Sequence, residues 1–372
     1  MIYDNLQKNP KPIVEIKNKI SYNFVDGAFV EITGTTSLYY LVKFINDETD
    51  EVIYETRIQN NQWARTSTKY FIKWRIEIYE KNHLMFYHVY DATDKRVMIS
   101  FDSASLGDNI AWMPYVLEFK RKHNCHVVVS TFKNFLFQDV YPELEFVNPG
   151  TKVDDLYASY LVGWFYDKGK EPALANTVPL QQTATNILGL DYQEIRPYIA
   201  YTTRNKFDDK YVTIATNSTA GCKFWTREGW QEVINFLHEN GYNVINISME
   251  DNPFDNCQPL KDKSMQNTMD AIASSSFFIG LSSGLSWLAW AMKRPVVMIA
   301  NFTEENHEFS CTRITNTKVC HGCWNKSEFR FDRGDWNWCP VHKDTDRMFE
   351  CQKTITAQEV IEAIKPLITF RG

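Results

Sequence analysis

From residue 211 to residue 300, short apolar runs alternate with segments that have the spacing of a helix. The apolar runs are YVTIAT, YNVINIS, FFIGL and PVVMIA, at residues 211–216, 242–248, 277–281 and 295–300. The helical segments between them lie at residues 226–241, 265–275 and 285–292. Continuous apolar strands separated by helices are typical of a parallel sheet with helices on both faces. The alternation therefore predicts a doubly wound α/β domain.

The first of these helices has clear end signals. Thr226 is a favoured N-cap residue, and Gly241 stands where a left-handed residue commonly ends a helix. Near the carboxyl end, residues 355–368 form another amphipathic pattern, with Thr356 as its cap, which predicts a closing helix.

An earlier part of the chain predicts a second α/β domain. The apolar run RVMISF at 96–101, the helical pattern at 110–123 and the run CHVVVSTF at 125–132 fit a strand, helix and parallel strand. Two such domains in tandem leave a cleft between the carboxyl ends of their sheets, where these folds usually bind ligands. That geometry suits nucleotide-sugar chemistry, among other uses.

The segment before these domains has a different pattern. Between residues 21 and 90, short alternating apolar runs are separated by the turn-like sequences DG, TGTT, NDETD and NNQ. This pattern predicts an antiparallel β module. We therefore divide the chain into a β-rich module at 1–93, an α/β domain at 94–205 and an α/β domain at 206–372.

Composition and charge exclude several classes of protein. The chain has 40 lysines and arginines against 46 aspartates and glutamates, a formal net charge of −6, which disfavours a broadly basic nucleic-acid surface. Its longest apolar stretch, near 272–300, is interrupted by polar residues and Pro295, so we expect no membrane span. The start, MIYDNLQKNPKP, lacks the apolar core of a secretory signal. We expect a cytoplasmic protein.

A candidate catalytic carboxylate follows the first predicted strand of the 94–205 domain. In SLGDNIAW, Gly107 permits a close approach of backbone and ligand, and Asp108 stands near the start of a helix. Placed at the carboxyl edge of the sheet, Asp108 is a candidate general base toward a hydroxyl nucleophile. An equally frequent alternative is that Asp108 only caps the helix. Asp102 is a competing carboxylate that is less well placed.

Two further loops between a strand and a helix are candidate anion sites. In NSTAGCKFW, Thr219 and Lys223 would meet phosphate at a helix N-terminus, although many such loops bind no phosphate. In GLSSGLSW, hydroxyls and backbone N–H groups of Ser282, Ser283 and Gly284 would meet sugar or phosphate oxygens. The alternative for this second loop is a tight turn packed on the neighbouring helix.

The cysteines near the carboxyl end have the spacing of a metal site. Four of the eight cysteines form the pattern C-x2-C-x15-C-x11-C at Cys320, Cys323, Cys339 and Cys351. Four thiolates bind zinc by default, and they also hold iron. His321 and His342 lie close enough in sequence to replace one cysteine, and buried thiols without a metal are a further alternative. With four protein ligands the ion has no open position, so we predict a structural finger at 311–352.

Three regions, taken in order, resemble the signature regions of the bacterial heptosyltransferases. They are SLGDNIAWMPY, TAGCKFWTREGWQEVINFL and MDAIASSSFFIGLSSGLSWLAWAMKRPVVMI, within roughly residues 97–300. The resemblance implies the GT-B architecture and heptose transfer with inversion from ADP-heptose. By position it implies Asp108 as the base, Lys223 as the phosphate ligand, and Ser283 with Gly284 in the donor-binding loop. The lipopolysaccharide-core enzymes carry Asp and His where this chain has Ser282 and Trp287.

The β module and the cysteine insertion are foreign to the lipopolysaccharide-core enzymes. Both resemble the autotransporter heptosyltransferases, which modify serines of bacterial adhesins, bind iron through such a finger and assemble into large rings. The resemblance then covers nearly the whole chain. It implies one iron ion per chain, with zinc as the alternative, an adhesin acceptor and a homo-oligomer without nucleic acid. A related transferase with another donor or a non-protein acceptor, and a non-catalytic metal-stapled scaffold, remain as alternatives.

Overall fold

The computed structural model of the chain describes residues 18–35, 38–205, 207, 210–250 and 253–369.

 Residues 1–17, 36–37, 206, 208–209, 251–252 and 370–372 lie outside this description. The expected absence of a secretory signal rests on the first of these segments and therefore lies outside the described residues. The predicted boundary at 205/206 also falls beside a segment that is not described.

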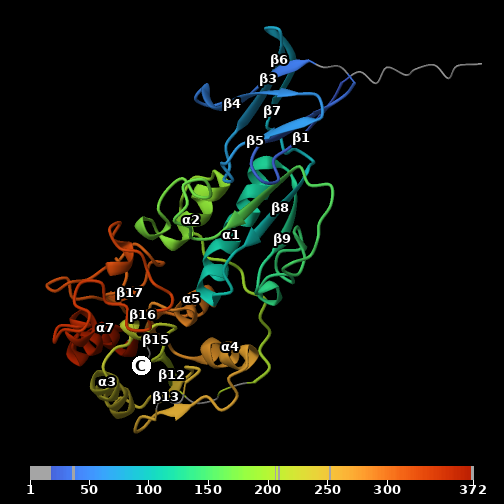
Figure 1. The fold of residues 1–372 in the computed structure, drawn as a ribbon. Coiled ribbons are helices and arrows are strands. Elements are labelled where there is room, and N and C mark those ends of the chain that lie inside the picture. The colour runs from blue at the N-terminus through green and yellow to red at the C-terminus, as the bar shows by residue number, and fades with distance from the viewer. Residues whose placement is uncertain (1–17, 36–37, 206, 208–209, 251–252, 370–372) are drawn as a thin grey trace, which may run out of the picture.

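The N-terminal module is antiparallel, as its alternating pattern predicts, and it forms two small sheets (Figure 1). One sheet has the order β1-β2-β5, with strands Lys19–Asn23, Phe29–Thr33 and Gln62–Arg65. The other has the order β4-β3-β6-β7, with strands Glu51–Gln59, Tyr39–Asn46, Trp74–Glu80 and His83–Val89. The sequence pattern did not indicate β1 and β5, because short strands with few apolar residues resemble loops.

The next part of the chain is a four-stranded parallel sheet with the order β10-β9-β8-β11. Its strands are Glu145–Phe146, His126–Ser130, Arg96–Phe101 and Ala158–Val162. The helices of this part are α1 (Leu106–His123) and α2 (Leu180–Leu188). The backbone N–H of Phe24 donates to the Tyr157 carbonyl, which attaches the N-terminal module beside β11. The predicted unit of strand, helix and parallel strand is thus present.

The carboxyl part is a six-stranded parallel sheet, which confirms the doubly wound prediction. Its order is β14-β13-β12-β15-β16-β17, with strands Gln258–Pro259, Asn243–Asn246, Tyr211–Ala215, Phe278–Leu281, Val296–Ile299 and Thr312–Ile314. Its helices are α3 (Arg227–Glu239), α4 (Met265–Ser274), α5 (Gly284–Ala291), α6 (Glu350–Lys353) and α7 (Ala357–Thr369). The short edge strands β14 and β17 carry too few apolar residues to be recognised from sequence.

The predicted end signals hold in this sheet. The Thr226 side chain caps α3 by accepting from the Gly229 N–H, and Gly241 is left-handed with φ of 76°. At the closing helix, the Thr356 hydroxyl accepts from the Glu359 N–H at 3.3 Å. Cap residues were therefore reliable guides to helix boundaries in this chain.

Two helices from different sheets meet at their N-termini. A Cβ atom on Gly284, the first residue of α5, would lie 2.9 Å from the Leu106 Cβ and 3.0 Å from the Gly107 nitrogen. Such distances are too short for real contacts, so a glycine is needed where α1 and α5 approach each other. This approach brings the loop before α1 against the loop before α5. Both loops carry predicted site residues.

Among the described residues, every helix is too short or too polar to cross a membrane.

Candidate active site and cysteine cluster

A cavity of about 590 Å³ lies where the loops of the two sheets meet. It collects all six residues that the sequence predicts for catalysis and donor binding: Asp108, Thr219, Lys223, Ser282, Ser283 and Gly284. These residues come from loops after β8, β12 and β15, at the carboxyl ends of parallel strands. The cavity therefore has the place that ligands take in this class of fold.

Asp108 lies in the first turn of α1 and reaches this cavity. Ser105 is the N-cap residue, so the alternative in which Asp108 only caps the helix is wrong. The buried Asn109 side chain donates to the carbonyls of Ser103 and Ser105, at 2.8 and 2.7 Å, and fixes the preceding loop. Asp102 is exposed and does not line the cavity. Of the two candidate carboxylates, only Asp108 faces the space where a substrate fits.

The surroundings of Asp108 perturb its pKa in opposing directions. Burial raises the pKa of the Asp108 carboxyl above its usual range, and this effect is the largest. Hydrogen bonds from the side chains of Ser103 and Trp164, and the positive charge of Lys223, lower the pKa in part. A carboxylate with a raised pKa is a better proton acceptor than an ordinary aspartate.

Lys223 lies at the end of a short 3₁₀ turn, Gly221–Lys223, rather than at the start of a long helix. Helix α3 begins only at Arg227, so the expected helix N-terminus is not at this loop. The Lys223 Nζ donates to the Ser282 carbonyl at 3.1 Å and lies 4.8 Å from the centre of the Phe302 ring. Burial lowers the pKa of Lys223, and the charges of Glu308 and Asp108 raise it. The ammonium group therefore links the loop after β12 to the loop after β15, both in the six-stranded sheet.

The loop after β15 leads directly into α5, as predicted, with Ser283 as the N-cap residue. The Ser283 Oγ is buried and has no hydrogen-bond partner among the described residues. A buried polar atom without a partner is costly unless a ligand or water satisfies it. The Ser282 Oγ instead donates to Glu308 Oε1 at 2.5 Å, so this hydroxyl is already engaged within the protein.

A buried ion pair behind this loop was not predicted from the sequence. Glu308 and Arg313 are 2% and 5% exposed, and their charged atoms lie 2.7 Å apart. Arg313 is the main favourable partner that overcomes burial, and the pKa of Glu308 falls to about 2. The Thr303 hydroxyl also donates to Glu308 at 3.0 Å. Through Glu308 the ion pair holds the loop of Ser282 in place. The spacing of Glu308 and Arg313 in the sequence does not indicate that they form a buried ion pair.

The cysteine-containing segment forms one wall of the same cavity, which was also not predicted. Its side chains at the cavity are Trp324, Phe331, Arg333, Asp335 and Trp336. Trp336 is 47% exposed, whereas Trp287 and Trp290 are buried. The sequence spacing of the cysteines indicates a finger, but it contains no information about what the finger covers.

A second cavity of about 560 Å³ adjoins the first and shares Thr219, Lys223, Ser283 and Gly284 with it. Its remaining wall is partly apolar and includes Ile247, Met249, Met265 and Leu285. The two cavities together offer a polar compartment beside Asp108 and a more apolar one on the other side of Lys223.

The four predicted metal ligands lie near one another. Cys320, Cys323, Cys339 and Cys351 are all free of disulfides. Burial, and to a smaller extent the neighbouring cysteines, raise the pKa of Cys320 to about 11 and that of Cys351 to about 12. The negative charges of neighbouring thiolates repel one another, and a cation bound between them would stabilise the deprotonated form. The donor set thus fits a bound metal ion, although ligation by all four cysteines stays a prediction.

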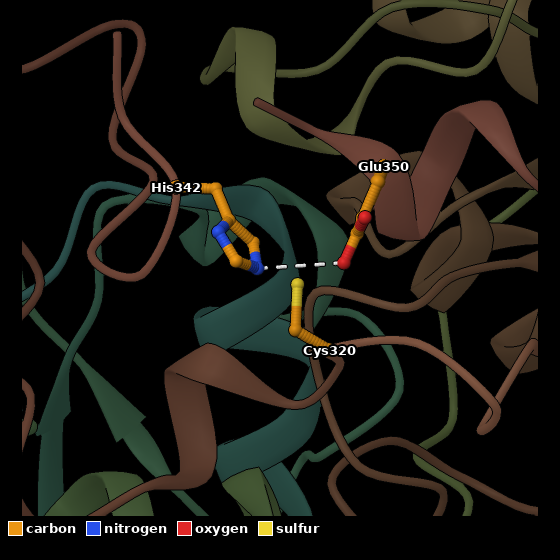
Figure 2. Close-up of side chains that lie close together, drawn as sticks. All are labelled: Cys320, His342 and Glu350. Atoms are coloured by element: carbon orange, nitrogen blue, oxygen red, sulfur yellow. Dashed lines mark ion pairs between the residues drawn. The ribbon is translucent and has the colours of Figure 1, made fainter. Parts of the chain in front are cut away.

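A second set of potential metal ligands, which shares Cys320 with the first, has its ligand atoms close to one another. Cys320, His342 and Glu350 place one ligand atom each within 4.8 Å of one another (Figure 2). The His342 Nε2 lies 3.4 Å from Glu350 Oε1. His342 was considered as a replacement ligand from its place in the sequence, whereas Glu350 was not.

Comparison with known proteins gives the family. Residues 157–330 match glycosyltransferase family 9 (heptosyltransferase). The chain is 34% identical over 383 residues to the autotransporter heptosyltransferase Aah of Escherichia coli, and the match covers 96% of each chain. The chain belongs to the autotransporter heptosyltransferase family.

Other members of the autotransporter heptosyltransferases are also similar over most of their length. The crystal structure of TibC from enterotoxigenic E. coli, an iron-containing dodecameric glycosyltransferase, matches with a TM-score of 0.89 and 31% identity, over 95% of this chain and 97% of TibC. Another crystal structure holds TibC in complex with ADP-D-beta-D-heptose and matches with a TM-score of 0.88 and 30% identity, over 98% and 100% of the two chains. BimC of Burkholderia thailandensis, named an inactive autotransporter heptosyltransferase, is 30% identical over 94% of this chain and 86% of BimC.

These findings confirm the predicted GT-B type fold and the prediction of a glycosyltransferase. They agree with the resemblance that the three motifs, the β module and the cysteine spacing indicated. The roles of the individual side chains in this autotransporter heptosyltransferase stay predictions that the geometry now makes specific.

Proposed function

We propose that this chain transfers heptose from ADP-heptose to serine hydroxyls of an autotransporter adhesin, with inversion at the anomeric carbon. The observation that carries the proposal is the single cavity in which Asp108, Lys223 and the unpartnered Ser283 hydroxyl converge. The ADP-heptose complex of TibC supports the choice of donor. We expect the reaction in the cytoplasm.

In this mechanism Asp108 accepts the proton of the serine hydroxyl as its oxygen attacks the anomeric carbon. The bond to the ADP oxygen breaks in the same step, so the displacement inverts the configuration. Lys223 and the N–H groups at the start of α5 stabilise the negative charge that develops on the departing diphosphate. The two cavities share Lys223, so the diphosphate fits at their junction, with the sugar toward Asp108 and the nucleoside in the more apolar compartment.

The cysteine finger would hold one iron ion, with zinc as the alternative, through Cys320, Cys323, Cys339 and Cys351. Four thiolates leave no open coordination position, so the ion would supply folding energy rather than chemistry. The description of TibC as iron-containing and dodecameric supports both the metal and a homo-oligomer. We propose that this chain likewise binds a metal ion and forms a homo-oligomer.

The N-terminal module is the proposed contact for the acceptor or for a neighbouring subunit. Large apolar side chains are exposed on its strands, at Tyr39, Tyr54, Trp63, Leu84 and Tyr87. Exposed aromatic side chains are enriched at protein contact surfaces.

A transferase with a different donor is the second candidate. Ser282 and Trp287 stand where the lipopolysaccharide-core enzymes carry Asp and His. The Ser282 hydroxyl is bonded to Glu308 and Trp287 is buried, so the residues that would contact the sugar differ from those of the core enzymes. Because the relative BimC is named inactive, a non-catalytic binding protein is a further outcome that experiments must distinguish.

Replacing Lys223 by alanine should weaken the binding of both ADP and ADP-heptose by about 10-fold or more, because a charge-assisted contact to phosphate is lost. Calorimetric titration with ADP measures this directly. Lys210→Ala is the matched control, since Lys210 also lies over an aromatic ring, at 4.1 Å from the centre of Tyr242, but lines neither cavity. Unchanged ADP affinity in the Lys223 variant would exclude the phosphate role.

A further inference from the structure

The segment between Cys323 and Cys339, here called the finger wall, is attached to both halves of the molecule. On one side, the Asn176 side chain donates to the Trp324 and Lys326 carbonyls at 3.1 and 3.0 Å. On the other side, the Gly221 N–H donates to the Trp336 carbonyl at 3.0 Å, within the turn that carries Lys223. The finger wall therefore spans the cleft between the two α/β parts, beside the cavity that contains Asp108.

Arg333 is the cation that the finger wall presents to this cavity. Its guanidinium carbon lies 3.9 Å from the centre of the Trp164 ring, which fixes the side chain by stacking. Both Arg333 and Trp164 line the cavity together with Asp108. Among the described residues, no carboxylate lies within ion-pair distance of Arg333, so its donors are available to a ligand.

The charges around the cavity favour an anionic ligand between the two sheets. Glu308 is neutralised by Arg313, and Asp335 is paired with Lys343. The charged side chains left to act on a ligand are then Asp108, Lys223 and Arg333. A diphosphate diester carries two negative charges, and Lys223 supplies only one positive charge.

We propose that Arg333 is a donor-binding residue that contacts the diphosphate of the nucleotide sugar in the cavity that it shares with Lys223. This inference rests on the proposed function. An arginine fork matches two phosphate oxygens at once, which a lysine cannot do. The finger wall then contributes directly to the donor site, in addition to any part in metal binding or assembly.

The test is calorimetric titration of the full-length, metal-loaded protein with ADP and with AMP. Arg333→Gln should weaken ADP binding about 10-fold or more and AMP binding much less, because AMP lacks the second phosphate. Arg333→Lys should recover only part of the loss, because it restores the charge without the fork. Metal content and oligomer size should stay as in the wild type, which shows that the finger remains folded.

Arg330→Gln is the matched control. Arg330 belongs to the same finger wall and lies over an aromatic ring, 5.0 Å from the centre of Tyr166, but it does not line the cavity. This variant should bind ADP as the wild type does. If Arg333→Gln also binds ADP like the wild type, the inference is overturned while the proposed function stands. If the wild type itself binds no ADP, the proposed function fails and the inference fails with it.

Discussion

Replacing Asp108 by asparagine should lower turnover by about 100-fold or more while leaving donor affinity within a few-fold of the wild type. Asparagine keeps the shape of the side chain but cannot accept the proton of the attacking hydroxyl. Glu308 and Asp335 also line the cavity but are held in ion pairs, so the loss of Asp108 removes the base without removing the phosphate contact of Lys223. Steady-state rates and donor titration of the same preparations separate the two effects.

Asp102→Asn is the matched control for this prediction, because Asp102 precedes the same helix but is exposed outside the cavity. It should retain wild-type turnover. The pH profile gives a second check. Because burial raises the pKa of Asp108, the base becomes protonated at a higher pH than an ordinary aspartate. As the pH falls through that raised pKa, kcat/KM of the wild type should fall. Wild-type turnover in Asp108→Asn would remove Asp108 from the role of base.

Replacing Cys323 by serine should abolish the stoichiometric metal ion and the ordered oligomer together. Cys323 is buried in the finger, and its pKa is raised by burial and by the neighbouring Cys339, as expected for thiols that share a cation. Losing one of four thiolates opens the site and removes the folding energy that the metal supplies. Elemental analysis and size-exclusion chromatography with light scattering measure metal content and oligomer size.

His342→Ala distinguishes the two possible ligand sets. If the four cysteines bind the ion, this variant keeps its metal, and Cys257→Ser, which alters a cysteine outside the finger, keeps it as well. The opposite pattern, with metal retained in Cys323→Ser and lost in His342→Ala, would assign the ion to Cys320, His342 and Glu350 instead. A wild-type protein without any metal would contradict the prediction altogether.

Much of the fold followed from local patterns in the sequence. The parallel strands β12, β15 and β16 are buried along their whole length and form continuous apolar runs, which are easily recognised. Thr226, as a cap residue, and Gly241, as a left-handed residue, correctly predicted where α3 begins and ends. The short edge strands β14 and β17 were not predicted, because two or three residues are too few to show an alternating pattern of apolar side chains.

The site was predictable only where its residues lie in loops between a strand and a helix. Asp108 and Ser283 stand directly beside such transitions, so the sheet topology alone brings them to one edge. Glu308, Arg313 and Arg333 come from irregular segments whose place depends on tertiary packing. Sequence spacing contains no signal for that packing, and these residues became visible only in the folded chain.

ADP-heptose is the proposed donor, and a thermal-shift panel tests this assignment. The panel compares ADP-heptose, ADP-glucose, ADP, UDP-glucose, GDP-mannose and CMP-sialic acid on the full-length protein. A ligand at about 100 times its dissociation constant adds roughly 2.7 kcal/mol of stability, enough to raise the midpoint measurably. We predict that only the ADP compounds raise the midpoint, with ADP-heptose giving the largest shift. A larger shift with a different nucleotide sugar, or no shift with any of them, would contradict the account.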